Sequence, residues 1–331
     1  MNDEFDFIAI GDIVTDAFIE LQDAKVDCDI DEANCQISMR FGDKIPYKEV
    51  TIVPAVGNSP NASVSASRLG LKTALVTNLG NDNDGTEALA QLKKDRVDDR
   101  FIKIHDDIKT NYHYVLLYEK ERTILIKHEA YPYELPEIGK PKWLYLSSLG
   151  ENSLPFHHAI ASYLKENPEV KLAFQPGTFQ IKLGYEQLKD IYEVTEVFFC
   201  NKEEAGRILQ IKETDEKKLL DGLYKLGPNI IVLTDGPKGA YTYDGKEIWH
   251  MPMYPDIKEI VDRTGAGDAF SSTFTSALAL GKTIPEALAW GPINSMNVCQ
   301  YIGAQAGLLS PEKLQEYLAN APENYKAIKL N

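Results

Sequence analysis

Residues 262–270 have the sequence Asp-Arg-Thr-Gly-Ala-Gly-Asp-Ala-Phe, and apolar residues at helical spacing follow until Gly281. Thr-Gly-Ala-Gly at a helix start turns backbone N–H groups toward one point, where the helix dipole also favours an anion. A carboxylate beside such a cradle would repel phosphate unless it accepts a proton. Gly265, Ala266 and Gly267 are therefore predicted to form an anion cradle, and Asp268 to be a general base, as in phosphoryl transfer to a hydroxyl.

The same residues have a simpler interpretation. Asp268 would then be an ordinary first-turn acid favoured by the helix dipole, and the glycines would only allow tight packing. The preceding Asp-x-Thr and the small residues of the following helix favour the functional interpretation.

Short apolar runs alternate with amphipathic stretches along most of the chain. Strands are predicted at residues 5–10, 73–77, 143–146, 171–174, 197–200 and 229–233, and helices at 58–69, 85–94, 156–165, 202–210 and 216–226. This alternation is typical of βαβ units, in which helices cover both faces of a mainly parallel sheet. The fold class is therefore α/β, and a ligand is expected beyond the carboxyl ends of the strands.

Two segments, about residues 17–54 and 109–127, interrupt this pattern. The first alternates apolar and polar residues, and the second contains a candidate hairpin with a charged turn. We expect both to form one small separate sheet and favour a lid over the site. The alternatives are an edge extension of the main sheet and a dimer contact through the apolar face of the small sheet. Because no linker composition divides the chain, residues 1–331 are predicted to form a single domain with this lid inserted.

Composition excludes several classes of protein. The 331 residues include 35 Lys and Arg against 50 Asp and Glu, a net charge of −15, which should repel nucleic acid and anionic membranes. No apolar run approaches the roughly 18 residues of a membrane span, and the acidic start does not resemble a signal peptide. Cysteines at 28, 35, 200 and 299 show no CxxC spacing, which favours free thiols in a reducing cytoplasm over disulfides or a zinc site.

The stretch at 262–270 resembles the C-terminal signature of the ribokinase-like (PfkB) carbohydrate kinase family. Five further motifs occur in that family's order: Gly-Asp-Ile-Val-Thr-Asp at 11–16, Val-Gly-Asn-Ser-Pro-Asn-Ala at 56–62, Leu-Gly-Asn-Asp-Asn-Asp-Gly at 79–85, Asn-Lys-Glu-Glu-Ala at 201–205 and Thr-Asp-Gly-Pro-Lys-Gly-Ala at 234–240. Each motif is weak alone, but six in order at the expected strand ends are specific. The resemblance implies a ribokinase-like three-layer α/β/α fold, with a mainly parallel central sheet and a small β-sheet lid.

The resemblance also implies roles for individual residues. The acceptor is expected to contact Asp16, Gly57, Asn58 and Asn61, and the nucleotide to contact Thr234, Gly236, Gly239 and Asn297. Asn201 and Glu204 are expected near Mg²⁺ through water, and Asp262 near a monovalent cation, commonly K⁺. ATP and Mg²⁺ are the expected cofactors, with K⁺ as a further candidate.

Several of these residues have structural alternatives. Glu204 is also what the first turn of a helix commonly contains, an interpretation about as strong as a role with magnesium. Gly236 and Gly239 would also suit a hairpin, because a strand-like stretch and a turn follow them. The 6 histidines show no metal-ligand spacing and are expected to be structural or at the surface.

The chain departs from the family pattern at two places. Val56 stands where the N-terminal signature usually has the first of two adjacent glycines, so the backbone approach to the acceptor is expected to differ. Gln175 stands where the family often has an Asp, a change that would move a metal or acceptor contact.

These features predict an ATP-dependent cytoplasmic kinase that phosphorylates a hydroxyl of a sugar or sugar-like small molecule, with a homodimer through the lid as a candidate assembly. A nucleoside kinase would use the same machinery, so the acceptor partner is a sugar or a nucleoside. A catalytically silent relative would keep the fold, but the intact Gly-Ala-Gly-Asp disfavours it. A nicotinamide-dependent dehydrogenase fits poorly, because no GxGxxG follows the first strand.

Overall fold

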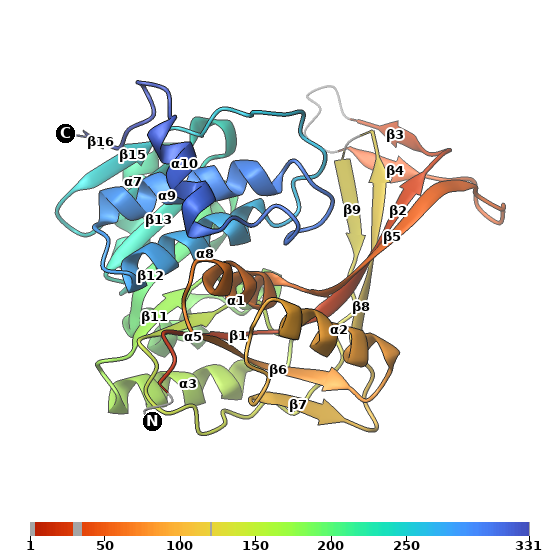
Figure 1. Ribbon diagram of the computed structural model, residues 1–331, viewed down its shortest axis with the longest axis horizontal. Coiled ribbons are helices and arrows are strands. Elements are labelled where there is room, and N and C mark those ends of the chain that lie inside the picture. The colour runs from red at the N-terminus through yellow and green to blue at the C-terminus, as the bar shows by residue number, and fades with distance from the viewer. Residues whose placement is uncertain (1–3, 29–34, 120, 331) are drawn as a thin grey trace.

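A computed structural model describes residues 4–28, 35–119 and 121–330 of the chain (Figure 1). Its central sheet has ten strands in the order β16-β15-β14-β13-β12-β11-β10-β1-β6-β7. The strands from β7 to β13 are parallel, and β14, β15 and β16 extend the sheet in antiparallel fashion. Their bounds are β1 Phe7–Ile10, β6 Thr73–Gly80, β7 Ile102–His105, β10 Trp143–Leu146, β11 Lys171–Phe174, β12 Thr195–Asn201, β13 Ile230–Thr234, β14 Ala240–Tyr243, β15 Ile248–Met251 and β16 Ile328–Leu330.

The central sheet is buried on both faces because successive strand residues point in opposite directions. In β1, Phe7 and Ala9 belong to one hydrophobic core, and Ile8 and Ile10 belong to the other. The first core includes residues of α1 (Asn58–Arg68), α2 (Asn83–Lys94), α8 (Ala266–Ala279), α9 (Ile284–Val298) and α10 (Pro311–Ala319). The second includes residues of α3 (Leu154–Glu166), α5 (Tyr185–Glu193), α6 (Lys202–Leu209) and α7 (Glu216–Tyr224), near which the short α4 (Thr178–Leu183) lies. The predicted three-layer α/β/α fold is confirmed.

Helix α8 is enclosed by its neighbours. The Phe270 ring covers Gly291 of α9, where an added Cβ would lie 2.8 Å from the ring. On the sheet side, Phe274 meets Phe199 of β12 edge to face at 5.6 Å. Because every residue from 268 to 277 is buried, the first turn of α8 is held in one place.

The lid is a second sheet that projects from the core (Figure 1). It contains β2 (Val14–Leu21), β5 (Tyr47–Val56), β8 (Asn111–Tyr118) and β9 (Glu121–Leu125), in the order β5-β2-β8-β9. The β2–β5 and β8–β9 pairs are antiparallel, whereas β2 and β8 are parallel. The two excursions of the chain therefore meet along the β2–β8 pair in one small separate sheet, as expected. Residues 25–27 and 36–38 of the first excursion form a further two-stranded sheet.

One prediction about the cysteines was wrong. Cys28 and Cys35 form a disulfide, whereas Cys200 and Cys299 are free and buried. The two bonded cysteines flank β3 (Lys25–Asp27) and β4 (Gln36–Ser38), an antiparallel pair in which Asp27 lies opposite Gln36. The next residue outward on each strand is a cysteine, so the register brings the two sulfur atoms together.

In the described ranges, no helix is both long and apolar enough to cross a membrane.

Candidate active site

A cavity of about 430 Å³ opens where α8 begins, between the central sheet and the lid. The ends of five parallel strands supply part of its wall: Asp12, Ser148, Gln175, Asn201 and Thr234. The lid supplies another part, which includes Val14, Asp16, His113, Arg122 and Ile124. The lid thus covers a cavity at the carboxyl ends of the strands, as expected, and is not an edge extension of the main sheet.

Asp268 lies in the first turn of α8 and is 7% exposed. Asn58 Nδ2 donates to Oδ1 at 2.7 Å, Asn61 Nδ2 to Oδ2 at 2.8 Å, and Gln175 Nε2 to Oδ1 at 3.1 Å. Burial raises the pKa of the Asp268 carboxyl above its ordinary value, while the three amide donors and the charge of Arg122 act in the opposite direction.

The predicted anion cradle coincides with the start of α8. Gly265 has a φ of +79° and directly precedes the helix, so its left-handed conformation sets the helix start. The N–H of Gly267 belongs to the first turn and has no intrahelical carbonyl to bond, and Gly267 lines the cavity. The N–H of Ala266 lies 3.4 Å from the carbonyl of Arg263, and Ala266 is not among the residues that line the cavity.

Asp262 fixes the loop that leads into α8. Its Oδ1 accepts hydrogen bonds from the backbone N–H of Thr264 at 2.9 Å and from the Thr264 hydroxyl at 2.7 Å. Its Oδ2 accepts from the N–H of Gly303 at 3.0 Å. The carboxylate therefore ties the loop at 262–264 to the loop at residue 303, next to the cradle.

The N-terminal end of α1 meets the same cavity. Gly57, at φ +120°, precedes the helix, and an added Cβ would lie 2.7 Å from the carbonyl oxygen of Asp12. Both asparagines predicted as acceptor contacts, Asn58 and Asn61, lie in α1 and donate to Asp268. The structure therefore joins the predicted acceptor contacts directly to the predicted base.

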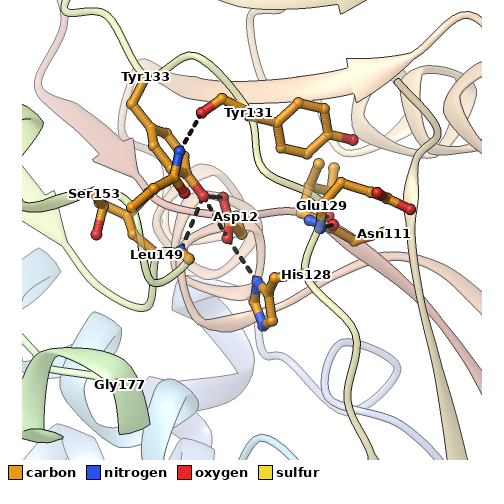
Figure 2. Close-up of polar contacts among 12 residues, drawn as sticks. Asp12, Asn111, His128, Glu129, Tyr131, Tyr133, Leu149, Ser153 and Gly177 are labelled. Atoms are coloured by element: carbon orange, nitrogen blue, oxygen red, sulfur yellow. Dashed lines mark hydrogen bonds and ion pairs between the residues drawn. The ribbon is translucent and has the colours of Figure 1, made fainter. Parts of the chain in front are cut away.

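A second buried carboxylate, Asp12, also lines the cavity. Figure 2 shows His128 and Tyr133 converging on it. Nδ1 of His128 is 2.7 Å from Asp12 Oδ2, and the Tyr133 hydroxyl is 2.9 and 3.0 Å from the two oxygens. Burial and the Asp12 charge raise the pKa of Tyr133, which therefore remains a hydroxyl donor. Asp12 thus fixes the ring of His128 at the cavity wall.

The predicted acceptor contact Asp16 lies beside this cluster, on β2. It is buried, and the Nδ1 of His113, from the neighbouring β8, is 3.5 Å from its Oδ1. The rings of His113 and His128 are 5.3 Å apart, and both line the cavity. These two histidines therefore face the cavity, a position that their spacing in the sequence did not indicate.

Asn201 and Glu204 form a capping box at the start of α6. Asn201 Oδ1 accepts from the Glu204 N–H, and Glu204 Oε2 accepts from the Asn201 N–H, both at 2.8 Å. Both residues also line the cavity, and burial raises the pKa of Glu204. Glu204 is therefore a first-turn acid, as its structural alternative states, and both residues cap α6 at a position that faces the cavity.

The four predicted nucleotide contacts are not gathered in one place. Thr234 lines the cavity at the end of β13. Gly236 and Gly239 belong to the short turn that joins β13 to the antiparallel β14, as in the hairpin alternative. Asn297 is 7% exposed in α9, donates to the Gly307 carbonyl at 2.6 Å and accepts from the Tyr317 hydroxyl at 3.2 Å. The last three are absent from the cavity lining.

Sequence reasoning missed several cavity residues. Asp12 is the second residue after β1 and stands in the same Gly-Asp-Ile-Val-Thr-Asp motif as Asp16, so its position near a strand end was the available signal. His128 lies in an irregular segment after β9, where periodicity gives no signal. Gln175 was visible as a departure from the family pattern, but its contact with Asp268 was not.

Comparisons with known proteins agree with this geometry. The sequence profile described as "pfkB family carbohydrate kinase" matches residues 23–311. The chain is 28% identical over 285 residues to an ATP-dependent 6-phosphofructokinase of Thermoanaerobacterium thermosaccharolyticum, covering 81% of this chain and 85% of that protein. It is 25% identical over 229 residues to a nucleoside kinase of Methanothermobacter thermautotrophicus, covering 68% and 72%.

Among solved structures, the ribokinase of Arabidopsis thaliana complexed with ribose and ATP superposes with a TM-score of 0.80 at 19% identity, covering 95% of this chain and 99% of that one. The fold is therefore ribokinase-like. The chain belongs to the pfkB family of carbohydrate kinases. It is a sugar or nucleoside kinase, a phosphotransferase that acts on a hydroxyl group, from a family of ATP-dependent kinases.

The geometry of the cradle predicts that alanine lowers the free energy of unfolding by different amounts at Gly265 and at Gly267. At Gly265 an added Cβ would lie 2.2 Å from the Ala304 Cβ, whereas at Gly267 the nearest atom would be 3.9 Å away. Left-handed strain and this clash should make Gly265→Ala lower the free energy of unfolding by about 2 kcal/mol or more. The matched control Gly267→Ala should change it by less than about 0.5 kcal/mol. Denaturant unfolding measures both, and equal costs would contradict this description of the cradle.

Proposed function

We propose that this protein transfers the γ-phosphoryl group of ATP to a hydroxyl of a sugar, with Asp268 as general base. The supporting observation is that a buried carboxylate faces the cavity from the first turn of α8, beside the N–H of Gly267. A base and an anion site at one helix end are what phosphoryl transfer to a hydroxyl requires.

In this mechanism the acceptor oxygen bonds to the γ-phosphorus while the bond to the departing ADP breaks, and Asp268 takes the hydroxyl proton. Gly265, Ala266 and Gly267 stabilise the charge of the transferring group. The two glycines line the cavity and would offer their N–H groups, whereas Ala266, whose N–H faces the Arg263 carbonyl, would contribute through the helix dipole. The lid residues over the cavity exclude water, which limits hydrolysis of ATP.

Asn201 and Glu204 fit Mg²⁺ that is held through water. One Glu204 oxygen is committed to the capping box, which leaves the other for a bound water. Mg²⁺, when bound, would neutralise phosphate charge. Asp262 stands beside the cradle and would hold a monovalent cation, K⁺, with neighbouring carbonyls.

For the nucleotide, we propose contacts at Thr234, Gly236, Gly239 and Asn297. Thr234 supports this best because it lines the cavity. The glycine turn lies at the carboxyl end of β13, two residues further along, where the nucleotide would extend from the phosphates. Asn297 would act through the loop of Gly307, whose carbonyl it holds.

Hydroxyl-rich acceptors suit the part of the cavity that is lined by Asp12, Asp16, His113 and His128. These four side chains lie together and offer acceptor atoms that hydroxyl groups would bond. A nucleoside is the second candidate, because Phe179, like Ile124, gives the same cavity an apolar wall against which a base could pack. The protein would act on ATP in the cytoplasm.

The base assignment predicts the behaviour of Asp268→Asn. The amide cannot accept the hydroxyl proton, so the phosphorylation rate should fall by orders of magnitude, while MgATP affinity stays within about threefold. Calorimetric titration with MgATP and an ADP-release assay measure the two quantities. Near-normal turnover would show that another group is the base.

In the wild type, phosphorylation requires ionised Asp268. Because burial raises its pKa, the rate should rise with pH through a midpoint above the ordinary Asp value of 3.8. A pH–rate profile measures this limb.

Acceptor binding should depend on Asp16. A screen of ribose, fructose, their phosphates and nucleosides with MgATP identifies the acceptor. With that acceptor, Asp16→Asn should raise KM on the order of tenfold or more, with little change in MgATP affinity, since a buried hydrogen bond to a charge is lost. Asp23→Asn, an exposed change in the turn after β2, is the control. Equal KM values for the two variants would remove Asp16 from the acceptor site.

We also propose a homodimer through the lid. Val50, Ile52, Tyr114 and Leu125 of the lid sheet are exposed apolar residues, an unusual density for a surface that stays in water. Ile52→Glu should shift the molar mass measured by light scattering from that of two chains to that of one. Ile211→Glu, an equally apolar exposed site outside the lid, should not. A wild-type protein that is a monomer at all concentrations would overturn this.

A further inference from the structure

We infer that Gln175 is a positioning residue for Asp268. Together with Asn58 and Asn61 it forms what we call the amide cage, which occupies the carboxylate and keeps it from deprotonating water when ATP is bound without an acceptor. This inference rests on the proposed role of Asp268 as general base.

The amide cage uses both carboxylate oxygens. Oδ1 accepts from Asn58 at 2.7 Å and from Gln175 at 3.1 Å, and Oδ2 accepts from Asn61 at 2.8 Å. The carboxylate is also largely buried. A carboxylate that already accepts three hydrogen bonds has few sites left for water. These bonds also lower its pKa relative to an equally buried carboxylate without them, so it is a weaker base.

The orientation of the Gln175 amide is fixed by two hydroxyls on its other side. The Tyr145 hydroxyl donates to Gln175 Oε1, and Ser271 Oγ is 2.9 Å from the same oxygen. The Ser271 hydroxyl is also 2.8 Å from the Gly267 carbonyl, so Tyr145 is the firmer of the two donors. Because the oxygen accepts from Tyr145, the NH₂ group faces Asp268. Tyr145 is fully buried in β10, and Ser271 lies one turn after Asp268 in α8, so the contact is anchored on both elements.

Asn61 is anchored in a comparable way. Gln305 Nε2 donates to Asn61 Oδ1 at 3.0 Å and to the Ala55 carbonyl at 2.7 Å. Asn58, in contrast, is only half-buried at the cavity wall. An acceptor hydroxyl would therefore reach Asp268 by displacing Asn58, while Gln175 and Asn61 keep the carboxylate in position. A sugar held at Asp16 can make this displacement, whereas a single water has no such second contact.

The step that the amide cage suppresses is hydrolysis. In that reaction a water oxygen bonds to the γ-phosphorus, the bond to ADP breaks, and the water proton passes to Asp268, giving ADP and phosphate. Removing the Gln175 donor frees a lone pair for water and strengthens the base, so hydrolysis should accelerate.

The first test measures phosphate release from MgATP alone, without acceptor. Gln175→Leu should increase hydrolysis on the order of tenfold, as the loss of one hydrogen bond to a charged group implies, and the added change Asp268→Asn should abolish the increase. Gln187→Leu, an exposed glutamine of α5, is the matched control and should leave hydrolysis unchanged.

A second test uses the protein without nucleotide, through the ¹³C carboxyl titration of Asp268 by NMR. Gln175→Leu should raise its midpoint, and Gln175→Glu, which keeps acceptors for Tyr145 and Ser271, should raise it further by placing two carboxylates together. The charged groups of Arg122 and Glu204, which also act on Asp268, are unchanged in both variants.

The outcomes separate the two proposals. If Asp268→Asn retains phosphorylation, the base assignment itself fails. If Asp268→Asn is inactive but a folded Gln175→Leu neither raises hydrolysis nor shifts the Asp268 titration, the amide cage is wrong and the base assignment stands.

Discussion

The fold has to hold a carboxylate and, as proposed, a polyanionic substrate at one helix end. The carboxylate and the phosphates of that substrate would repel each other without positive groups nearby. The first turn of α8 offers N–H groups and a positive dipole end, which stabilise both. The buried packing of α8 and the left-handed Gly265 fix where that turn lies. Asp262, bonded to Thr264 and Gly303, keeps the preceding loop in place, so the arrangement does not depend on a ligand being present.

Local sequence signals were sufficient for the six predicted strands of the central sheet and for α8, whereas β7, β15 and β16 were not predicted. Apolar runs located β1, β10 and β11, and the glycines with the small residues behind them located the helix that holds Asp268. Boundaries were less accurate where polar residues continue a strand: β6 extends to Gly80 through Asn78, and β12 begins at Thr195. Such residues have no apolar pattern of their own and are strand only because a neighbouring strand pairs with them.

Features that join distant segments could not be predicted from the sequence. The lid depends on pairing Asp16 with His113, nearly a hundred positions apart, so its strand order and the histidines at the cavity had no local signal. The disulfide follows from the β3–β4 register, and composition alone pointed to free thiols. Gln175 was noted as an unusual residue, but only the structure shows Tyr145 and Ser271 turning its amide toward Asp268.

The two sides of the cavity come from different sources. The groups around Asp268 belong to α1, to the residue after β11 and to α8 of the core, whereas Asp16, His113 and Arg122 come from the lid. With the acceptor held by lid residues, as proposed, substitutions in the lid strands would change which acceptor binds and would leave Asp268 and its partners in place. In evolutionary terms, such a division lets the acceptor change while the groups that carry out the chemistry are kept. A lineage could acquire new substrates by mutating β2, β8 and β9 alone.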